Sequence, residues 1–264
     1  MESVKKEKKT LQYFASALAG AYFLFFTVVI CGFSVEKRVF ADSHPREKLA
    51  SYTTYFSQND GGRCENIRLA AASLDGIALQ PYGELSFNAA VGPRTAKNGY
   101  KTAKIILQGE FVDGVGGGVC QVSTTLYNAA LLSGLTVLES YAHSLRVGYV
   151  PPSRDAMVSS RSDLRLYNPT AETVYLATAV GDGYLRIAFY GKHTDFSYEI
   201  ESRTLAEIPP PDQPTADGKK AEYLRPPVSG LKSEAYLKTY QSGVLISVKR
   251  IRQDVYAPQA GKLA

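Results

Sequence analysis

The sequence lacks tryptophan and has only three histidines and three cysteines in 264 residues. Cys31 lies in a hydrophobic N-terminal segment, which leaves Cys64 and Cys120 for at most one disulfide and excludes a disulfide framework. The sequence contains no C-x-x-C or H-E-x-x-H motif, and the histidines are not clustered. We therefore expect no metal site and no cofactor.

The excess of positive over negative charges is also small. The formal net charge is +5, and outside the first ten residues the Lys and Arg side chains are scattered without interleaved aromatic residues. This pattern argues against nucleic acid as a partner. The apolar share of 45% and charged share of 21% predict a globular chain with room for one good-sized domain and its attachments. Nothing in the sequence indicates an oligomeric state.

The N-terminus predicts a membrane anchor. Lys5, Lys6, Lys8 and Lys9 precede an uncharged stretch from Thr10 to Val35, in which 11–33 is long enough for a helix that spans a bilayer. The lysines place 1–10 in the cytoplasm and the rest of the chain outside it. We expect a single-pass protein of the cell membrane. A late cleavage site at 39–41 leaves removal of the anchor open.

Composition divides the remaining chain into four parts. Charged residues at 34–50 indicate a tether, and alternating apolar runs at 51–192 indicate the main domain. Four prolines at 207–217 predict a stiff linker, taken as 193–217. The segment 218–264 contains two strand-like runs around Gln241-Ser242-Gly243, which predicts a small β-rich appendage that packs on the main domain or on a partner.

Within the main domain the pattern predicts an α+β fold. Tyr52–Phe56 reads as a strand, 66–74 as a short helix, and the runs beside Gln108-Gly109 as a hairpin. Further strands are expected at 136–138, 146–150, 164–167, 174–177 and 185–190, the last three as an antiparallel meander. A central helix that carries a cysteine at its N-terminus lies between these two sets of strands.

The central helix follows a glycine-rich loop, Gly114-Val115-Gly116-Gly117-Gly118-Val119-Cys120. Val122, Leu126, Ala129 and Ala130 share one helical face, and Gly134 provides a stop signal. Cys120 therefore lies at a helix N-terminus, where unpaired N–H groups and the helix dipole favour a thiolate. A small buried cysteine is the alternative interpretation. The loop lacks the Lys-Ser/Thr ending of a P-loop, which argues against phosphate binding.

A nucleophilic cysteine needs a base, and His143 follows 23 positions later at a predicted strand start. Asp155 or Asn88 could orient its imidazole, and the backbone amides of Gly116, Gly117 and Gly118 are suitable donors for an oxyanion. Arg94 and Arg154 could bind a substrate carboxylate, although structural roles are equally open for them. The layout is typical of thiol acyl transfer.

Several of these residues lie in motifs that are similar to those of a known protein family. The chain resembles the VanW family over about 50–192 in 82–88 (YGELSFN), 91–95 (VGPRT), 99–100 (GY), 116–128 (GGGVCQVSTTLYN), 143–144 (HS) and 149–156 (YVPPSRDA). Gln121, Ser123 and Ser144 join the substrate-site candidates through these motifs. Relatives commonly have Glu-Arg-His-x-His-Ser where this chain has 139–144 (ESYAHS), so only His143 matches. The tail weakly resembles the small G5-type β modules that often accompany the domain.

The resemblance implies an activity. Some members are L,D-transpeptidases that cross-link peptidoglycan through the domain's cysteine, and the family is named for its association with glycopeptide (vancomycin) resistance. For this chain it implies a thioester acyl-enzyme on Cys120, with His143 as the proton carrier and peptidoglycan stem peptides as substrates. The alternatives are a non-catalytic peptidoglycan-binding or envelope module, and an L,D-carboxypeptidase or cysteine peptidase that uses water as acceptor.

Overall fold

The computed structural model describes residues 47–107, 109–211 and 223–263. They fall in a unit that spans Pro45–Ala264. The predicted tail at 1–10, the predicted anchor at 11–33 and nearly all of the predicted tether lie outside the described residues. None of the helices in the described ranges is long and apolar enough to cross a bilayer.

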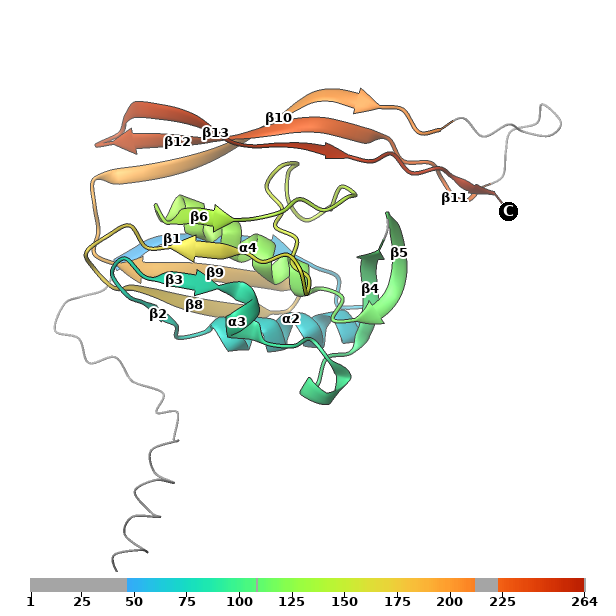
Figure 1. Cartoon of the computed structure of the whole chain (residues 1–264), viewed down its shortest axis with the longest axis horizontal. Helices are drawn as coiled ribbons and strands as arrows, with labels where there is room; N and C mark the ends of the chain where they lie inside the picture. Colours follow the sequence, from blue (N-terminus) through green and yellow to red (C-terminus); the bar gives the residue numbers. More distant parts are fainter. Residues whose placement is uncertain (1–46, 108, 212–222, 264) are drawn as a thin grey trace, which may run out of the picture. The chain divides into compact units, whose positions relative to one another are not determined.

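A four-stranded antiparallel sheet forms one layer of the fold (Figure 1). Its order is β1 (Glu47–Tyr55), β9 (Tyr184–Gly191), β8 (Val174–Gly181) and β2 (Ala78–Leu79). The predicted strands at 52–56, 174–177 and 185–190 are confirmed, and the turn at 181–183 joins β8 to β9 as expected. Strand β1 begins at Glu47, five residues earlier than its aromatic pattern indicated, because Lys48 and its neighbours pair with Gly191 and Tyr190.

The predicted meander is wrong at one strand. β7 (Arg165–Tyr167) leaves β8 and pairs instead with β3 (Glu84–Ser86) and β6 (Thr136–Glu139) in a separate three-stranded sheet. Leu166, fully buried between Leu85 and Val137 in this register, explains the choice of partners. The predicted hairpin is confirmed as β4 (Thr102–Leu107) and β5 (Glu110–Val115).

Two longer helices pack in the interior. α2 (Gly61–Leu74) starts at Asp60, whose side chain accepts a hydrogen bond from the Arg63 amide, as an N-cap does. α4 (Val119–Leu132) contacts α2, β1, β6 and β9 and is buried almost all round. This explains why its apolar stripe continues into buried polar side chains, which hydrogen-bond β1 and the irregular segment 154–156. A short helix α3 (Phe87–Val91) and a 3₁₀ turn η1 (Ala96–Asn98), neither of them predicted, complete this layer.

The C-terminal region contains more β-structure than its prolines led us to expect. β10 (Phe196–Ile208), β12 (Gly230–Gln241) and β13 (Val244–Tyr256) form a three-stranded antiparallel sheet, and β11 (Tyr223–Arg225) pairs with β14 (Lys262–Leu263). β10 occupies most of the segment expected to be a linker, because the prolines begin only at Pro209. The predicted hairpin is confirmed as β12–β13. The fold is thus mixed α and β, with mostly antiparallel sheets and few helices.

Candidate functional site

The glycine loop brings Cys120 to the N-terminus of α4, as predicted. Gly118 is the N-cap with φ of 105°, a backbone conformation that glycine adopts at little cost. A Cβ on Gly117 would lie 2.6 Å from the Lys104 carbonyl oxygen, so the loop passes closer to β4 than any other residue allows. Asn66 of α2 holds this approach, since its side-chain amide donates to the carbonyls of Gly117 and Lys101, both at 2.9 Å.

Cys120, His143 and Asp155 form a chain of three interacting side chains. The Cys120 side chain is partly exposed, and its sulfur lies 3.4 Å from the Val158 carbonyl oxygen and shares a hydrogen bond with the His143 side chain. His143, 6% exposed, lies with Nδ1 2.7 Å from Asp155 Oδ2. The same carboxylate oxygen accepts the His143 backbone amide at 2.7 Å. Of the two residues proposed to orient the imidazole, the structure therefore selects Asp155.

Burial and charge act in opposite directions on these groups. Burial raises the pKa of the Cys120 thiol, but the hydrogen bond and positive charge of His143 outweigh it and lower the pKa below its ordinary value. Burial lowers the pKa of His143, whereas the hydrogen bonds to Asp155 and Cys120 raise it to about 9. Both shifts favour a thiolate–imidazolium pair, the reactive form of a catalytic cysteine.

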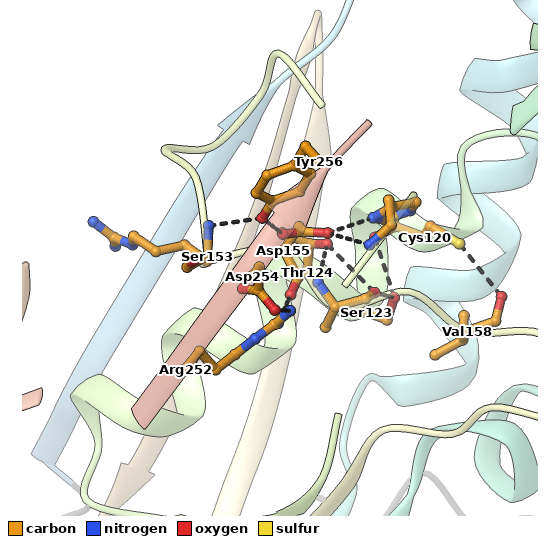
Figure 2. A network of polar contacts seen from close by, with 12 residues as sticks. Cys120, Ser123, Thr124, Ser153, Asp155, Val158, Arg252, Asp254 and Tyr256 are labelled. Carbon is orange, nitrogen blue, oxygen red and sulfur yellow. Dashed lines mark hydrogen bonds and ion pairs between the residues drawn. The ribbon is translucent and has the colours of Figure 1, made fainter. Parts of the chain in front are cut away.

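Asp155 is held from its other side by the C-terminal sheet (Figure 2). The carboxylate is 1% exposed and accepts a hydrogen bond on Oδ1 from the Tyr256 hydroxyl of β13. Its backbone carbonyl accepts from the Arg252 guanidinium. Burial raises the Asp155 pKa, yet the hydrogen bond and charge of His143, with Tyr256, lower it below the usual range. The carboxyl group is therefore charged at neutral pH.

The sulfur opens onto a groove of about 970 Å³. One set of lining residues is apolar and comes from the β4–β5 hairpin, with Ile105, Leu107 and Phe111 among them. Besides His143, four lining residues are Arg or Lys and none is acidic; they are Arg63, Arg94, Lys104 and Arg146. A groove of this composition suits an anionic substrate that also presents apolar surface.

Some backbone amides of the glycine loop already donate hydrogen bonds within the fold, and the others are candidate donors to an oxyanion. The amide of Gly116 donates to the Lys101 carbonyl at 3.0 Å, and that of Val119 donates back to Gly116 at 3.2 Å. The Gln121 amide donates to the Gly118 carbonyl at 2.9 Å. The proposed oxyanion donors therefore narrow to the amides of Gly117, Gly118 and Cys120, which stand at the open end of the helix dipole.

Several residues predicted to contact substrate have structural partners in the fold, and of these Gln121 also lines the groove. The Gln121 side chain donates to Thr54 Oγ1 and the Tyr55 carbonyl and accepts from Arg63, which ties α4 to β1. Ser123 Oγ donates to the Ala156 carbonyl at 2.6 Å and is fully buried. Arg154 bonds Asn128 and the Ile200 carbonyl, stacks on the Tyr52 ring and does not line the groove.

Asn88 and Ser144 have other partners in the structure, although Asn88 also lines the groove. The Asn88 side chain donates to the carbonyls of Ser159 and Ser162 and accepts from Arg94 at 2.7 Å, so it positions Arg94 rather than His143. Ser144 is exposed, is not among the groove-lining residues, and its carbonyl accepts the Ala257 amide. Arg94 remains a groove residue, and its charge helps to lower the pKa of Cys120 after the larger effects of burial and His143.

Three residues at the site were missed by sequence reasoning: Asn66, Tyr149 and Tyr256. Tyr149 lines the groove in 146–150, which is an irregular segment rather than the predicted strand. Burial and then the charge of Cys120 raise the pKa of its hydroxyl. The motif at 149–156 contained Tyr149 but gave no reason to assign it a role. Tyr256 lies 101 positions from Asp155, and no local pattern could have joined them.

Two other expectations are settled by the geometry. Cys64 and Cys120 are both free, so the single disulfide that the sequence allowed is absent from the described residues. Tyr141, at the position where relatives commonly have a histidine, is exposed, interacts with Glu139 and is not a groove-lining residue. The departure from the family pattern therefore lies outside the Cys120–His143–Asp155 chain. No group of three or more metal-binding side chains occurs within the described ranges.

Comparison with known proteins agrees with the motifs. Residues 62–190 match the model of a family described as VanW like protein. The chain is 39% identical over 164 residues to the uncharacterized protein YoaR of Bacillus subtilis. The aligned segment covers 62% of this chain and 52% of YoaR. It is 28% identical over 150 residues to the vancomycin B-type resistance protein VanW of Enterococcus faecalis, with 54% of each covered. The chain thus spans about half the length of these relatives. No solved structure matches it.

Proposed function

Because residues 62–190 are a VanW-like domain, we propose that this protein is a cysteine-dependent acyltransferase of the cell wall, an L,D-transpeptidase that acts on peptidoglycan stem peptides. The observation that carries the proposal is the Cys120–His143–Asp155 chain, of which Cys120 and His143 line a groove with several Arg and Lys side chains. The uncharged run at 11–33 supports an anchor that leaves the domain outside the cytoplasm, where peptidoglycan lies.

In this reaction the Cys120 thiolate attacks the carbonyl between the third residue of a stem peptide and the fourth, D-configured residue. The amides of Gly117, Gly118 and Cys120 stabilise the oxyanion. The C–N bond then breaks, and the His143 imidazolium gives its proton to the departing amine. A side-chain amine of a second stem peptide attacks the thioester, His143 takes the proton of that amine, and the thiolate leaves.

Charge and shape of the groove support this substrate. A stem peptide that ends in a D-amino acid carries a free carboxylate close to the bond to be broken. Arg94 and Arg146 line the groove that Cys120 opens onto, and both can pair with that carboxylate. The apolar side of the β4–β5 hairpin can cover the methyl groups and side-chain methylenes of the peptide. The vancomycin resistance in the name of the E. faecalis relative is consistent with a wall substrate.

The test uses the full chain in detergent, incubated with disaccharide-tetrapeptide muropeptide and analysed by mass spectrometry. We expect the wild type to form a dimer with loss of one D-alanine, and Cys120→Ala to form none. Cys64→Ala is the matched control and should retain activity, because Cys64 contacts the Ser57 carbonyl and does not line the groove.

The other outcomes separate the alternatives. Tripeptide without dimer would indicate an L,D-carboxypeptidase, since water would then be the acceptor of the same acyl-enzyme. Binding of the muropeptide without product, equal in wild type and Cys120→Ala, would favour a non-catalytic wall module. A soluble fragment for such assays should begin before Glu47, because a start at Ser51 would remove half of β1.

A further inference from the structure

The Tyr256 hydroxyl occupies a defined place in the polar network of the site. The side chain comes from the end of β13 and is 1% exposed. Its oxygen accepts a hydrogen bond from the Ser153 backbone amide at 2.7 Å. A tyrosine hydroxyl has one proton, and the amide already supplies the bond that its oxygen accepts. The hydroxyl proton is therefore directed to Asp155 Oδ1, the second partner of this oxygen.

This bond fixes the rotation of the Asp155 carboxylate. With Oδ1 held by Tyr256, Oδ2 faces His143 and accepts from its backbone amide and from Nδ1, both at 2.7 Å. A charged carboxylate only accepts, so Nδ1 is protonated, and Nε2 is the ring nitrogen that takes up the thiol proton when the thiolate–imidazolium pair forms. Tyr256 thus acts on the nucleophile through two intervening groups.

The C-terminal sheet clamps the loop that carries Asp155 at further points. Ser153, with φ of 59° in the left-handed region, lies with its hydroxyl 2.7 Å from the Ser233 hydroxyl of β12. Arg252 of β13 donates to the Asp155 carbonyl and to Asp254 at 2.9 Å. Two strands of this sheet therefore hold both the side chain and the backbone of the segment around Asp155, and Figure 2 shows the residues of β13, Arg252 and Tyr256, that do so.

We infer that Tyr256 is a positioning residue of the candidate catalytic centre, and that the C-terminal sheet is a working part of that centre rather than an appendage. The inference rests on the proposed role of Cys120 as nucleophile. It extends that role beyond the matched segment 62–190, which does not include Tyr256. The groups that interact electrostatically with Asp155 include His143, Tyr256, Tyr127, Tyr149 and Arg252.

The test measures thiol reactivity, which needs no substrate. The full chain and its Tyr256→Phe variant are treated with iodoacetamide from pH 5 to 10, and modification of the Cys120 peptide is followed by mass spectrometry. Tyr256→Phe keeps the ring and removes the proton donor to Asp155. We expect the alkylation rate of Cys120 at pH 7 to fall about three- to tenfold, with the midpoint of its pH profile shifted upward by up to about one unit.

Controls separate positioning from packing. Tyr236→Phe removes a hydroxyl from the same sheet that bonds Glu234, and its profile should match the wild type. In an Asp155→Asn background, Tyr256→Phe should cause no additional change, because both substitutions break the same chain of contacts. A fully additive effect would assign Tyr256 a packing role only and would overturn the inference.

A milder variant covers the case in which Tyr256→Phe does not fold. Ser233→Ala removes only the hydroxyl contact with Ser153 and should shift the profile in the same direction by a smaller amount. A wild-type profile in whichever of the two variants folds would contradict the inference. Loss of muropeptide activity is a separate result: an inactive wild type would remove the proposed function, whereas the alkylation profiles would still decide the role of Tyr256.

Discussion

At the scale of single residues, the role of a motif side chain follows from the hydrogen bonds that it makes within the fold. Asn88, Gln121 and Ser123 occupy motif positions close to Cys120, yet each makes two or more hydrogen bonds within the fold. Their role is to hold the loop, the helix and Arg94 in place. Asn88 and Gln121 also line the groove, beside Cys120, His143 and Arg146, whereas Ser123 does not. The motifs therefore contain residues proposed for the chemistry together with residues that hold the site in place.

Replacement of His143 tests the thiolate–imidazolium pair. With a pKa of about 9, His143 is positively charged at pH 7 and stabilises the Cys120 thiolate until the pH rises past that value. In His143→Gln, burial alone remains as the main influence and raises the thiol pKa. We expect Cys120 alkylation at pH 7 to slow by about tenfold or more. Alkylation of Cys64 in the same sample is the internal control, and an unchanged Cys120 rate would refute the pair.

Replacement of Arg146 tests recognition of the substrate carboxylate. Arg146 is exposed and lines the groove, so we expect its charge to contribute equally to binding of the proposed substrate and of its transition state. For Arg146→Gln we expect KM for the muropeptide to rise about five- to tenfold with kcat within about twofold of wild type. Arg165→Gln is the control, since Arg165 pairs with Glu84 away from the groove. A fall in kcat at constant KM would place Arg146 in the chemical step instead.

At the scale of elements, the glycine loop is the part that tolerates least change. In Gly117→Ala the new Cβ would lie 2.6 to 2.8 Å from the Lys104 carbonyl and from Ala103, so the loop must move away from β4. We expect loss of Cys120 reactivity and a free energy of unfolding lower by about 1–3 kcal/mol.

The matched control is Gly61→Ala at the start of α2, where nothing lies within 4 Å of the added methyl group. This variant should be neutral or more stable by about 0.5 kcal/mol. Thermal or urea unfolding measures the stability of both proteins, and iodoacetamide alkylation measures Cys120. A Gly117→Ala protein with wild-type stability and reactivity would show that the approach of the loop to β4 is not required.

The elements themselves were largely predictable from local patterns. α4, the β4–β5 and β8–β9 hairpins and the C-terminal hairpin each have a periodicity and a turn signal of their own. The pairing of strands that are far apart in the sequence was not predictable from such patterns. β7 joins β3 and β6 because Leu166 fits between Leu85 and Val137, and β10 joins β12, and neither choice leaves a mark in the local sequence. Tyr256 was missed for the same reason, whereas Cys120 and His143 lie in motifs and were found.

At the scale of the whole described unit, the C-terminal sheet shares its core with the rest of the fold. Ile200 of β10 belongs to the main hydrophobic cluster, and Leu237 and Ile251 pack against it. Gly134, just after α4, lies so close to Tyr198 of β10 that a Cβ there would fall 2.8 Å from the hydroxyl. In Figure 1 this sheet runs beside α4, in agreement with the contact between α4 and β10. The two parts should therefore unfold together.

Thermal unfolding tests this cooperation. We expect a single transition for the full chain in detergent, with amide protection in β12 lost at the same temperature as protection in β8, because burial of Ile200 and Tyr256 links the two sheets. Hydrogen exchange read by mass spectrometry follows both strands in one experiment. An earlier transition confined to β10, β12 and β13 would show that the sheet is an independent module.

The contact between Tyr256 and Asp155 also has a consequence for the order of events during biosynthesis. A polypeptide is synthesised from its N-terminus, so Cys120 and His143 leave the ribosome well before β13 does. Until β13 docks, Asp155 has no hydroxyl to fix it, and His143 has no fixed carboxylate to keep it charged. If Tyr256 positions Asp155 as inferred, we expect the thiol to reach its full reactivity only after β13 has docked.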